Sequence, residues 1–280
     1  MADECIHGFD DGLCAICFPP KAPEPAPQPE PAARANRVPG RRPSAASLRA
    51  PVAKPARAKA GAGALSAPPI DAGAVRIYHV THLDNLARIL GAGALVPDAA
   101  GAAPLVDLSA PAVREFRRAR AVDGTDAVIA DYVPFLLTPD ALVWNAVREG
   151  TPDPRLAAEA VERPAADHVM LVSSVAAARG ATTADGAVAV SDVDAALPGA
   201  ELAVAWPAVE RMLRLLAHEQ ETARLRTAEF LVRGEVPLER IALIAVGNER
   251  VRDRVRAALS AVGAKTRIAV YPPWFLPAED

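Results

Sequence analysis

Apolar residues follow two spacings from about residue 74 onward, and both predict regular secondary structure. Alternating or short continuous apolar runs predict strands over residues 75–80, 127–137, 168–174, 187–190, 228–232, 241–247 and 267–275. Apolar residues three and four positions apart predict helices over residues 83–90, 110–122, 206–226 and 249–263. Strands and helices follow one another without a repeated unit, so we predict one α+β domain over residues 74–280.

Two kinds of residue interrupt these patterns. Gly91 and Gly93 follow the first helical pattern and predict its end. Pro134 lies inside the predicted strand 127–137, and it has no backbone N–H to give to a neighbouring strand. We therefore expect this strand to lie at a sheet edge or to bend at Pro134.

The chain before residue 74 has no apolar period. Residues 19–70 contain 13 of the 27 prolines, mixed with Ala, Gly and Arg. Such a segment cannot bury enough apolar surface to offset its conformational entropy. We predict a disordered linker over residues 19–73.

Charge is distributed unevenly along the chain. Residues 1–20, 21–70 and 71–280 carry −4, +7 and −6, which gives the formal net charge of −3. The basic segment 21–70 can attract a polyanion without folding. No apolar run approaches the roughly 18 residues of a membrane helix, the N-terminus does not resemble a secretory signal, and three cysteines do not make a disulfide framework. We expect a cytoplasmic protein without a membrane partner.

A cluster of cysteine and histidine lies within residues 1–18. The stretch "CIHGFDDGLCAIC" places Cys5, His7, Cys14 and Cys17 in the spacing C-x-H-x6-C-x2-C. Four such ligands suit a tetrahedral structural Zn²⁺ and leave no open position for catalysis. We predict a zinc-knuckle-like motif, for which zinc would supply most of the folding free energy. The alternative is a chance cluster of free thiols.

The first predicted strand carries polar residues on one face. Alternation in "IYHVTHLDNL" sends His79 and Thr81 to one face and Tyr78 and Val80 to the other, and Asn85 follows one turn into the helix. These side chains could form the polar rim of a pocket. A structural histidine beside a capped helix is the alternative.

Two further stretches carry charge. Arg114, Arg117, Arg118 and Arg120 crowd the second helix, where guanidinium groups suit pyrophosphate oxygens or simply form a solvated basic face. Glu229 stands inside the apolar run of "RTAEFLV". A partly desolvated carboxylate is a stronger base, whereas an edge-strand glutamate would only face water.

Together, "IYHVTHLDNLARIL", the arginine helix, "DYVPF" and "RTAEFLV" resemble the DarT family of DNA ADP-ribosyltransferases over about residues 75–275. The resemblance implies a small ADP-ribosyltransferase fold with a central split β-sheet and flanking helices. It also implies transfer of ADP-ribose from NAD⁺ to a base of single-stranded DNA, typically thymine. Family members are bacterial toxins usually neutralised by a macrodomain antitoxin, so the resemblance implies such a partner.

The resemblance also assigns roles to residues. His79, Thr81 and Asn85 would bind NAD⁺, and Glu229 would be catalytic. Of the adjacent pair Arg117–Arg118, Arg117 is the preferred catalytic and NAD⁺-contacting arginine, with Arg118 as the neighbouring candidate. Cleavage of the ribose–nicotinamide bond passes through an oxocarbenium-like state, which a carboxylate such as Glu229 can stabilise.

The sequence departs from the family after "DYVPF". Leu136, Leu137 and Asp140 replace aromatic and basic groups expected on the DNA side, which reduces base stacking there. Three functions therefore stay open: transfer to single-stranded DNA, transfer to RNA, protein or water by the same fold, and binding without activity. Retention of His79, Thr81 and Glu229 argues against the last.

Overall fold

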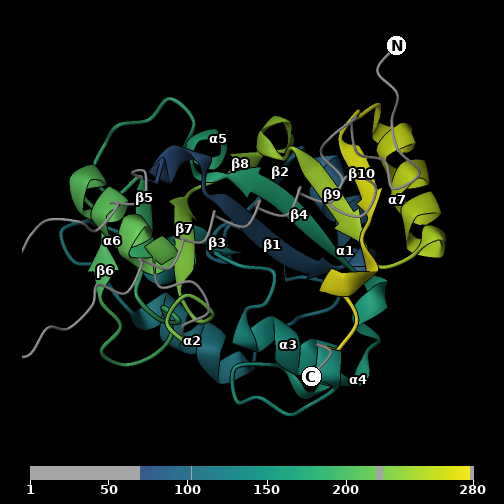
Figure 1. Ribbon diagram of the computed structural model, residues 1–280, viewed down its shortest axis with the longest axis horizontal. Coiled ribbons are helices and arrows are strands. Elements are labelled where there is room, and N and C mark those ends of the chain that lie inside the picture. The colour runs from purple at the N-terminus through teal and green to yellow at the C-terminus, as the bar shows by residue number, and fades with distance from the viewer. Residues whose placement is uncertain (1–69, 102, 219–222, 278–280) are drawn as a thin grey trace, which may run out of the picture.

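The computed structural model describes residues 70–101, 103–218 and 223–277. The predicted zinc motif and nearly all of the predicted linker therefore lie outside the described residues. The first described element is the short 3-10 helix η1 (Ala72–Ala74), whose start is capped by the Asp71 side chain. From there the chain forms a mixed α+β fold, as predicted, with helices around a central and mostly antiparallel sheet (Figure 1).

Eight strands of the described chain form the main sheet, in the order β10-β9-β4-β1-β3-β7-β5-β6. They are β1 (Arg76–His82), β3 (Tyr132–Leu136), β4 (His168–Ser174), β5 (Val188–Ser191), β6 (Leu202–Ala203), β7 (Glu229–Arg233), β9 (Leu243–Val246) and β10 (Arg267–Val270). A separate antiparallel pair joins β2 (Ala94–Leu95) to β8 (Val236–Pro237). Only β9 and β10 pair in parallel among the described strands, and a helix connects them.

The α-helices of the described chain are α1 (Leu83–Ala92), α2 (Pro111–Ala119), α3 (Leu142–Glu149), α4 (Ala158–Glu162), α5 (Val175–Arg179), α6 (Trp206–His218) and α7 (Glu249–Val262). Between these elements lie the short 3-10 helices η2 (Ile129–Asp131), η3 (Ala165–Asp167) and η4 (Leu238–Arg240), and η5 (Pro272–Trp274) follows β10. Helix α1 continues through Gly91 and ends at Gly93, whose φ of 73° suits glycine. Helices α3, α4 and α5 were not predicted, because α4 and α5 have only five residues each and no side chain caps the start of α3.

Alternation along the strands supplies a core on each face of the sheet. Ile77 and Leu171 pack with the apolar faces of α1, α6 and α7. Tyr78 and Met170, one residue away on the same strands, pack with α3 and the C-terminal segment. The predicted separation of Tyr78 from the face of His79 is therefore confirmed.

The sheet is nearly divided between β1 and β3. β1 forms seven register pairs with β4, from Arg76↔Ser174 to His82↔His168, but only one with β3, Tyr78↔Leu136. The Pro134 carbonyl accepts a hydrogen bond from the His79 ring of β1, so the nitrogen of Pro134, which has no hydrogen, faces β1 as well. We call this boundary between β1 and β3 the seam. It corresponds to the split expected in the central sheet.

Pro134 thus corrects one prediction. β3 is not an edge strand, because β7 pairs with it along its whole length on the other side. The missing N–H is tolerated because it falls at the seam, where the ladder with β1 has already stopped. The gap between the two ladders leaves room for a cavity.

Candidate active site

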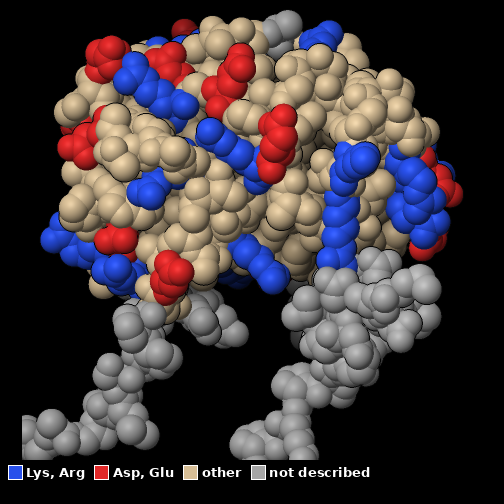
Figure 2. Space-filling model, turned by 90° about the horizontal axis from the view of Figure 1, so that it is seen from above, with Lys and Arg blue, Asp and Glu red and all other residues tan. Residues whose placement is uncertain are grey.

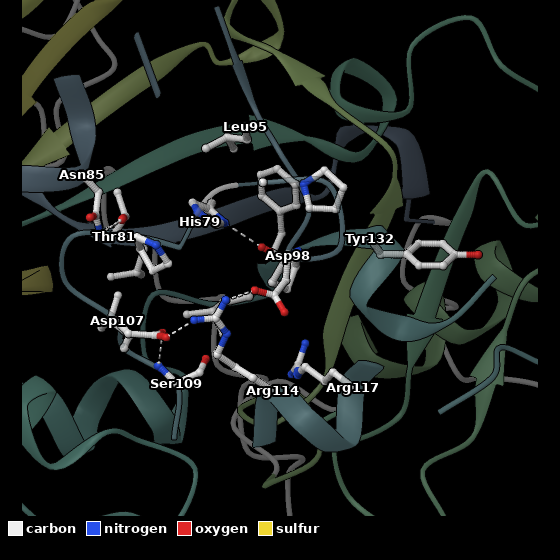
Figure 3. Close-up of a pocket in the computed structure, with 18 of the residues that line it drawn as sticks. His79, Thr81, Asn85, Leu95, Asp98, Asp107, Ser109, Arg114, Arg117 and Tyr132 are labelled. Carbon is white, nitrogen blue, oxygen red and sulfur yellow. Dashed lines mark hydrogen bonds and ion pairs between the residues drawn. The ribbon is translucent and has the colours of Figure 1, made fainter. Parts of the chain in front are cut away.

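A cavity of about 340 Å³ opens along the seam. Its walls come from β1, β3, one face of α1, one face of α2 and the segment 94–109 (Figure 3). A cavity of this size, with apolar walls and a few convergent polar groups, is typical of a small-molecule site. His79, Thr81, Asn85, Arg117 and Glu229, all predicted from the sequence, line it.

Glu229 is the first residue of β7 and is buried, with 7% of its surface exposed. Its backbone N–H donates to the Ser191 hydroxyl at 3.1 Å, and its Oε2 accepts from the Ala195 N–H at 3.2 Å. Burial raises the pKa of the Glu229 carboxyl, and the neighbouring Arg117 guanidinium opposes that rise. Glu229 is thus a desolvated carboxylate and not an edge-strand glutamate that faces water, and its role as a base stays a prediction.

Arg117 reaches Glu229 from α2. Its Nη2 lies 2.8 Å from both carboxylate oxygens of Glu229 and 3.1 Å from Oδ1 of Asp194. The Nε of Arg117 is buried and has no hydrogen-bond partner within the described part of the chain. Two carboxylates thus hold the guanidinium through one nitrogen, while its Nε is buried without a partner among the described residues.

Arg118 points elsewhere. Its side chain is 52% exposed, pairs with Asp98 at 2.8 Å and does not line the cavity. Arg114, one turn before Arg117, lines the cavity instead and pairs with both Asp98 and Asp107 (Figure 3). Of the two candidates, Arg117 lines the cavity and Arg118 does not. Arg114 and Arg117 are three residues apart, so this spacing places them on one helix face.

His79 faces the cavity from β1. Its Nδ1 lies 2.9 Å from the Pro134 carbonyl and must donate to it, because a carbonyl oxygen only accepts. Burial lowers the pKa of His79, so the ring is neutral near pH 7 and its Nε2 is left as an acceptor. The ring edge also contacts Phe135, with 5.7 Å between centroids. His79 is therefore fixed in one orientation and one tautomer.

Asn85 connects two parts of the cavity wall by hydrogen bonds. Its amide nitrogen donates to the Thr81 hydroxyl at 3.0 Å and to the Val106 carbonyl at 2.8 Å. Its amide oxygen accepts from the N–H groups of Leu105 at 2.8 Å and Val106 at 3.1 Å. These four bonds use the whole hydrogen-bonding capacity of the amide. Asn85 thus orients Thr81 and holds the wall of the cavity.

The residues that depart from the family pattern fall into different environments. Leu136 lines the cavity and is the register partner of Glu229 across β3 and β7. Leu137 is buried in the core, and Asp140 pairs with Arg148 at 3.0 Å. Only Leu136 of the three therefore changes the cavity wall, where it presents an aliphatic surface next to the carboxylate.

Two charged residues beside Arg117 were not anticipated. Asp194, between β5 and β6, and Arg155, between α3 and α4, both line the cavity beside Arg117. No motif marks either of them in the sequence. In the described part of the chain, no group of three or more His, Cys, Asp or Glu side chains could hold a metal ion, and none of the helices is long and apolar enough to cross a membrane.

Comparisons with known proteins agree with this geometry. The family model described as "ssDNA thymidine ADP-ribosyltransferase, DarT" matches residues 78–276. A DNA ADP-ribosyl transferase of Thermus sp. (strain 2.9) is 28% identical over 209 residues, which cover 71% of this chain and 95% of the relative. The family match includes every cavity residue predicted from the sequence.

Solved structures of the Thermus sp. 2.9 DarT have the same fold. The complex with ADP-ribosylated single-stranded DNA is 25% identical with a TM-score of 0.59, and covers 72% of this chain and 96% of that one. The complex with NAD⁺ is 24% identical with a TM-score of 0.56, and covers 72% and 98%. The chain therefore belongs to the DarT family and is an NAD⁺-dependent ADP-ribosyltransferase that acts on single-stranded DNA.

Proposed function

We propose that the cavity at the seam binds NAD⁺ with its nicotinamide ribose between β1 and Glu229, and that the acceptor is a thymine base. The buried Glu229–Arg117 pair on one wall of the cavity, opposite the neutral His79, is the observation that supports this. Thr81 and His79 lie where they can orient the nicotinamide amide and ribose. Arg114 and Arg117, one helical turn apart, offer guanidinium groups for the pyrophosphate.

The proposed reaction has one bond broken and one formed. The bond between ribose C1′ and the nicotinamide nitrogen breaks, and its electron pair leaves with nicotinamide, which becomes neutral. The ribose passes through an oxocarbenium-like state that the Glu229 carboxylate stabilises. A ring nitrogen of the base then bonds to C1′, and Glu229 accepts the proton that this nitrogen loses.

Acceptor identity can be tested directly. We expect purified full-length protein to transfer label from NAD⁺ to a single-stranded oligonucleotide that contains thymine, and not to a matched oligonucleotide with every thymine replaced by cytosine. RNA and protein pools, and free ADP-ribose released to water, are measured in parallel. Labelling of the thymine-free strand would contradict thymine as the target. Release of free ADP-ribose with no labelled DNA would favour an NAD⁺ hydrolase instead.

The N-terminal residues carry a second proposal. We propose that Cys5, His7, Cys14 and Cys17 bind one structural Zn²⁺, a proposal supported by their spacing. Elemental analysis should then find about one zinc per chain, and a Cys14→Ser Cys17→Ser variant should lose it. Three freely titrating thiols in metal-free native protein would contradict the proposal. Because the cavity lies within 78–276, the variant should keep transfer on short DNA.

The biological setting follows the family resemblance. We propose that the protein is a cytoplasmic toxin with a macrodomain antitoxin. On the face shown in Figure 2, Lys and Arg side chains are interspersed with Asp and Glu and do not form one basic patch. Residues 71–280 are also acidic overall, so the basic segment 21–70 is the better source of sequence-independent attraction to DNA.

A further inference from the structure

Two carboxylates share the guanidinium of Arg117. Nη2 of Arg117 contacts Glu229 at 2.8 Å and Oδ1 of Asp194 at 3.1 Å. Asp194 is 5% exposed, and the same Oδ1 accepts from the Ala196 N–H at 2.8 Å. The residue between them, Ala195, donates its N–H to Glu229. The turn that follows β5 therefore contacts Glu229 in two ways: directly through the Ala195 N–H, and indirectly through the ion pair of Asp194 with Arg117.

Arg155 also contacts this turn. Its Nη1 lies 3.7 Å from Oδ2 of Asp194. Its own position is fixed by Asp153, which accepts from Nε at 2.8 Å and from Nη2 at 2.6 Å. The backbone carbonyl of Arg155 accepts from the N–H of Ala110, the residue before α2. The segment that contacts Asp194 thus also anchors the helix that carries Arg117.

We propose that Asp194 and Arg155 are positioning residues: Asp194 anchors the Arg117 guanidinium independently of Glu229, and Arg155 holds Asp194 in place. This inference rests on the proposed role of Glu229 as the base. When Glu229 takes up a proton from the acceptor, it loses the charge that attracts Arg117. Asp194 keeps its charge and therefore keeps Arg117 in place through that step.

The charges around Glu229 come from three elements. Arg117 lies on α2, Asp194 on the turn after β5, and Arg155, paired with Asp153, on the segment between α3 and α4. The other ionisable groups that line the cavity are His79, whose pKa is lowered by burial, Arg114 with its partners Asp98 and Asp107, and Arg88, Tyr78 and Tyr132. Asp194 is therefore the acidic neighbour that shares a cation with Glu229, and its charge raises the pKa of Glu229.

This arrangement predicts pH shifts of opposite sign. Asp194→Asn removes a negative charge beside Glu229, so the pKa of Glu229 falls and the acid limb of kcat/KM moves to lower pH. Arg155→Gln removes a positive charge from the same neighbourhood, so the acid limb moves to higher pH. We expect kcat to fall about tenfold in Asp194→Asn, a part of the roughly 10²–10⁴ that a positioned base contributes. Asp194→Glu should restore most of it.

The experiment measures kcat/KM from pH 5 to 9 for full-length wild type and the three variants, with NAD⁺ and a thymine-containing single strand. Asp126→Asn is the matched control, because Asp126 forms an exposed ion pair with Arg233 away from the cavity. An unchanged acid limb in Asp194→Asn, or shifts of the same sign in Asp194→Asn and Arg155→Gln, would overturn the inference. If Asp194→Asn does not fold, Arg155→Gln tests the inference alone: a shift of the acid limb to higher pH supports it, and no shift or a shift to lower pH overturns it. An active Glu229→Gln variant would instead overturn the proposed function itself.

Discussion

Glu229→Gln is expected to reduce ADP-ribose transfer by at least about 10²–10³, with NAD⁺ affinity nearly unchanged. The glutamine keeps the volume of the side chain and an oxygen that can accept from the Ala195 N–H. It lacks the negative charge that stabilises the oxocarbenium-like state and cannot take up the proton from the base. Since these interactions develop in the transition state, their loss lowers kcat and leaves ground-state binding in place.

Single-turnover transfer and NAD⁺ binding should be measured on the same preparations of wild type and Glu229→Gln. The control is Glu235→Gln, since Glu235 is exposed and lies just beyond the other end of β7. Thermal stability should fall much less than in a variant that lacks Arg117, because Asp194 still pairs with Arg117 and the group that is replaced is a buried carboxylate with a raised pKa. A variant that loses NAD⁺ affinity and melting temperature as much as turnover would make Glu229 a structural residue.

Arg117→Ala is expected to have the largest effect on stability. It leaves Glu229 and Asp194 buried without the cation that they share. Removal of one partner from a buried ion pair costs about 3–5 kcal/mol. In a domain of this size, each kcal/mol lowers Tm by about 2–4 °C. NAD⁺ binding and transfer should be lost together, which separates this phenotype from that of Glu229→Gln.

The adjacent Arg118→Ala is the matched control for Arg117→Ala. Arg118 is half exposed and forms one surface ion pair, so its removal should change stability by less than about 1 kcal/mol. Similar losses of stability and NAD⁺ binding in both variants would contradict the assignment of Arg117.

The penalty in Arg117→Ala should also depend on pH. Arg117 opposes the raised pKa of Glu229, so without the guanidinium the folded-state pKa of Glu229 rises further above its unfolded value and protonation relieves the penalty as pH falls. The loss of Tm should therefore be smaller at pH 5 than at pH 7.5. Burial lowers the pKa of His168 to about 4, so this residue destabilises the folded protein below pH 6.5. The effect is the same in wild type and variant, and it therefore cancels in the difference between their Tm values.

The sequence predicted those features of the fold that depend on local pattern. The strand expected over residues 168–174 is β4 without a change of boundary, and the helix expected over 249–263 is α7, one residue shorter because Gly263 caps it. The prediction for Pro134 was incomplete. A missing N–H disfavours pairing on one side only, and sequence alone does not show that this side faces the seam.

The sequence predicted those site residues that belong to short motifs. His79 and Thr81 belong to a strand with predicted alternation, Glu229 begins a short apolar run, and the three meet in one cavity. The contact between Arg117 and Glu229 spans 112 positions of sequence, so no spacing rule could establish it. Asp194 and Arg155 lie in polar connecting segments where acids and arginines are common, and only the tertiary structure brings them to Arg117.

The seam has a consequence for cooperativity. It separates two continuous backbone ladders, β10-β9-β4-β1 and β3-β7-β5-β6, which share one register pair. Such ladders behave as distinct units in hydrogen exchange when little backbone bonding joins them. His79 belongs to the first ladder and Glu229 to the second. A ligand that contacts both residues adds its binding free energy to the free energy needed to separate the two ladders. We therefore expect occupancy of the cavity to make the two ladders open together in hydrogen exchange.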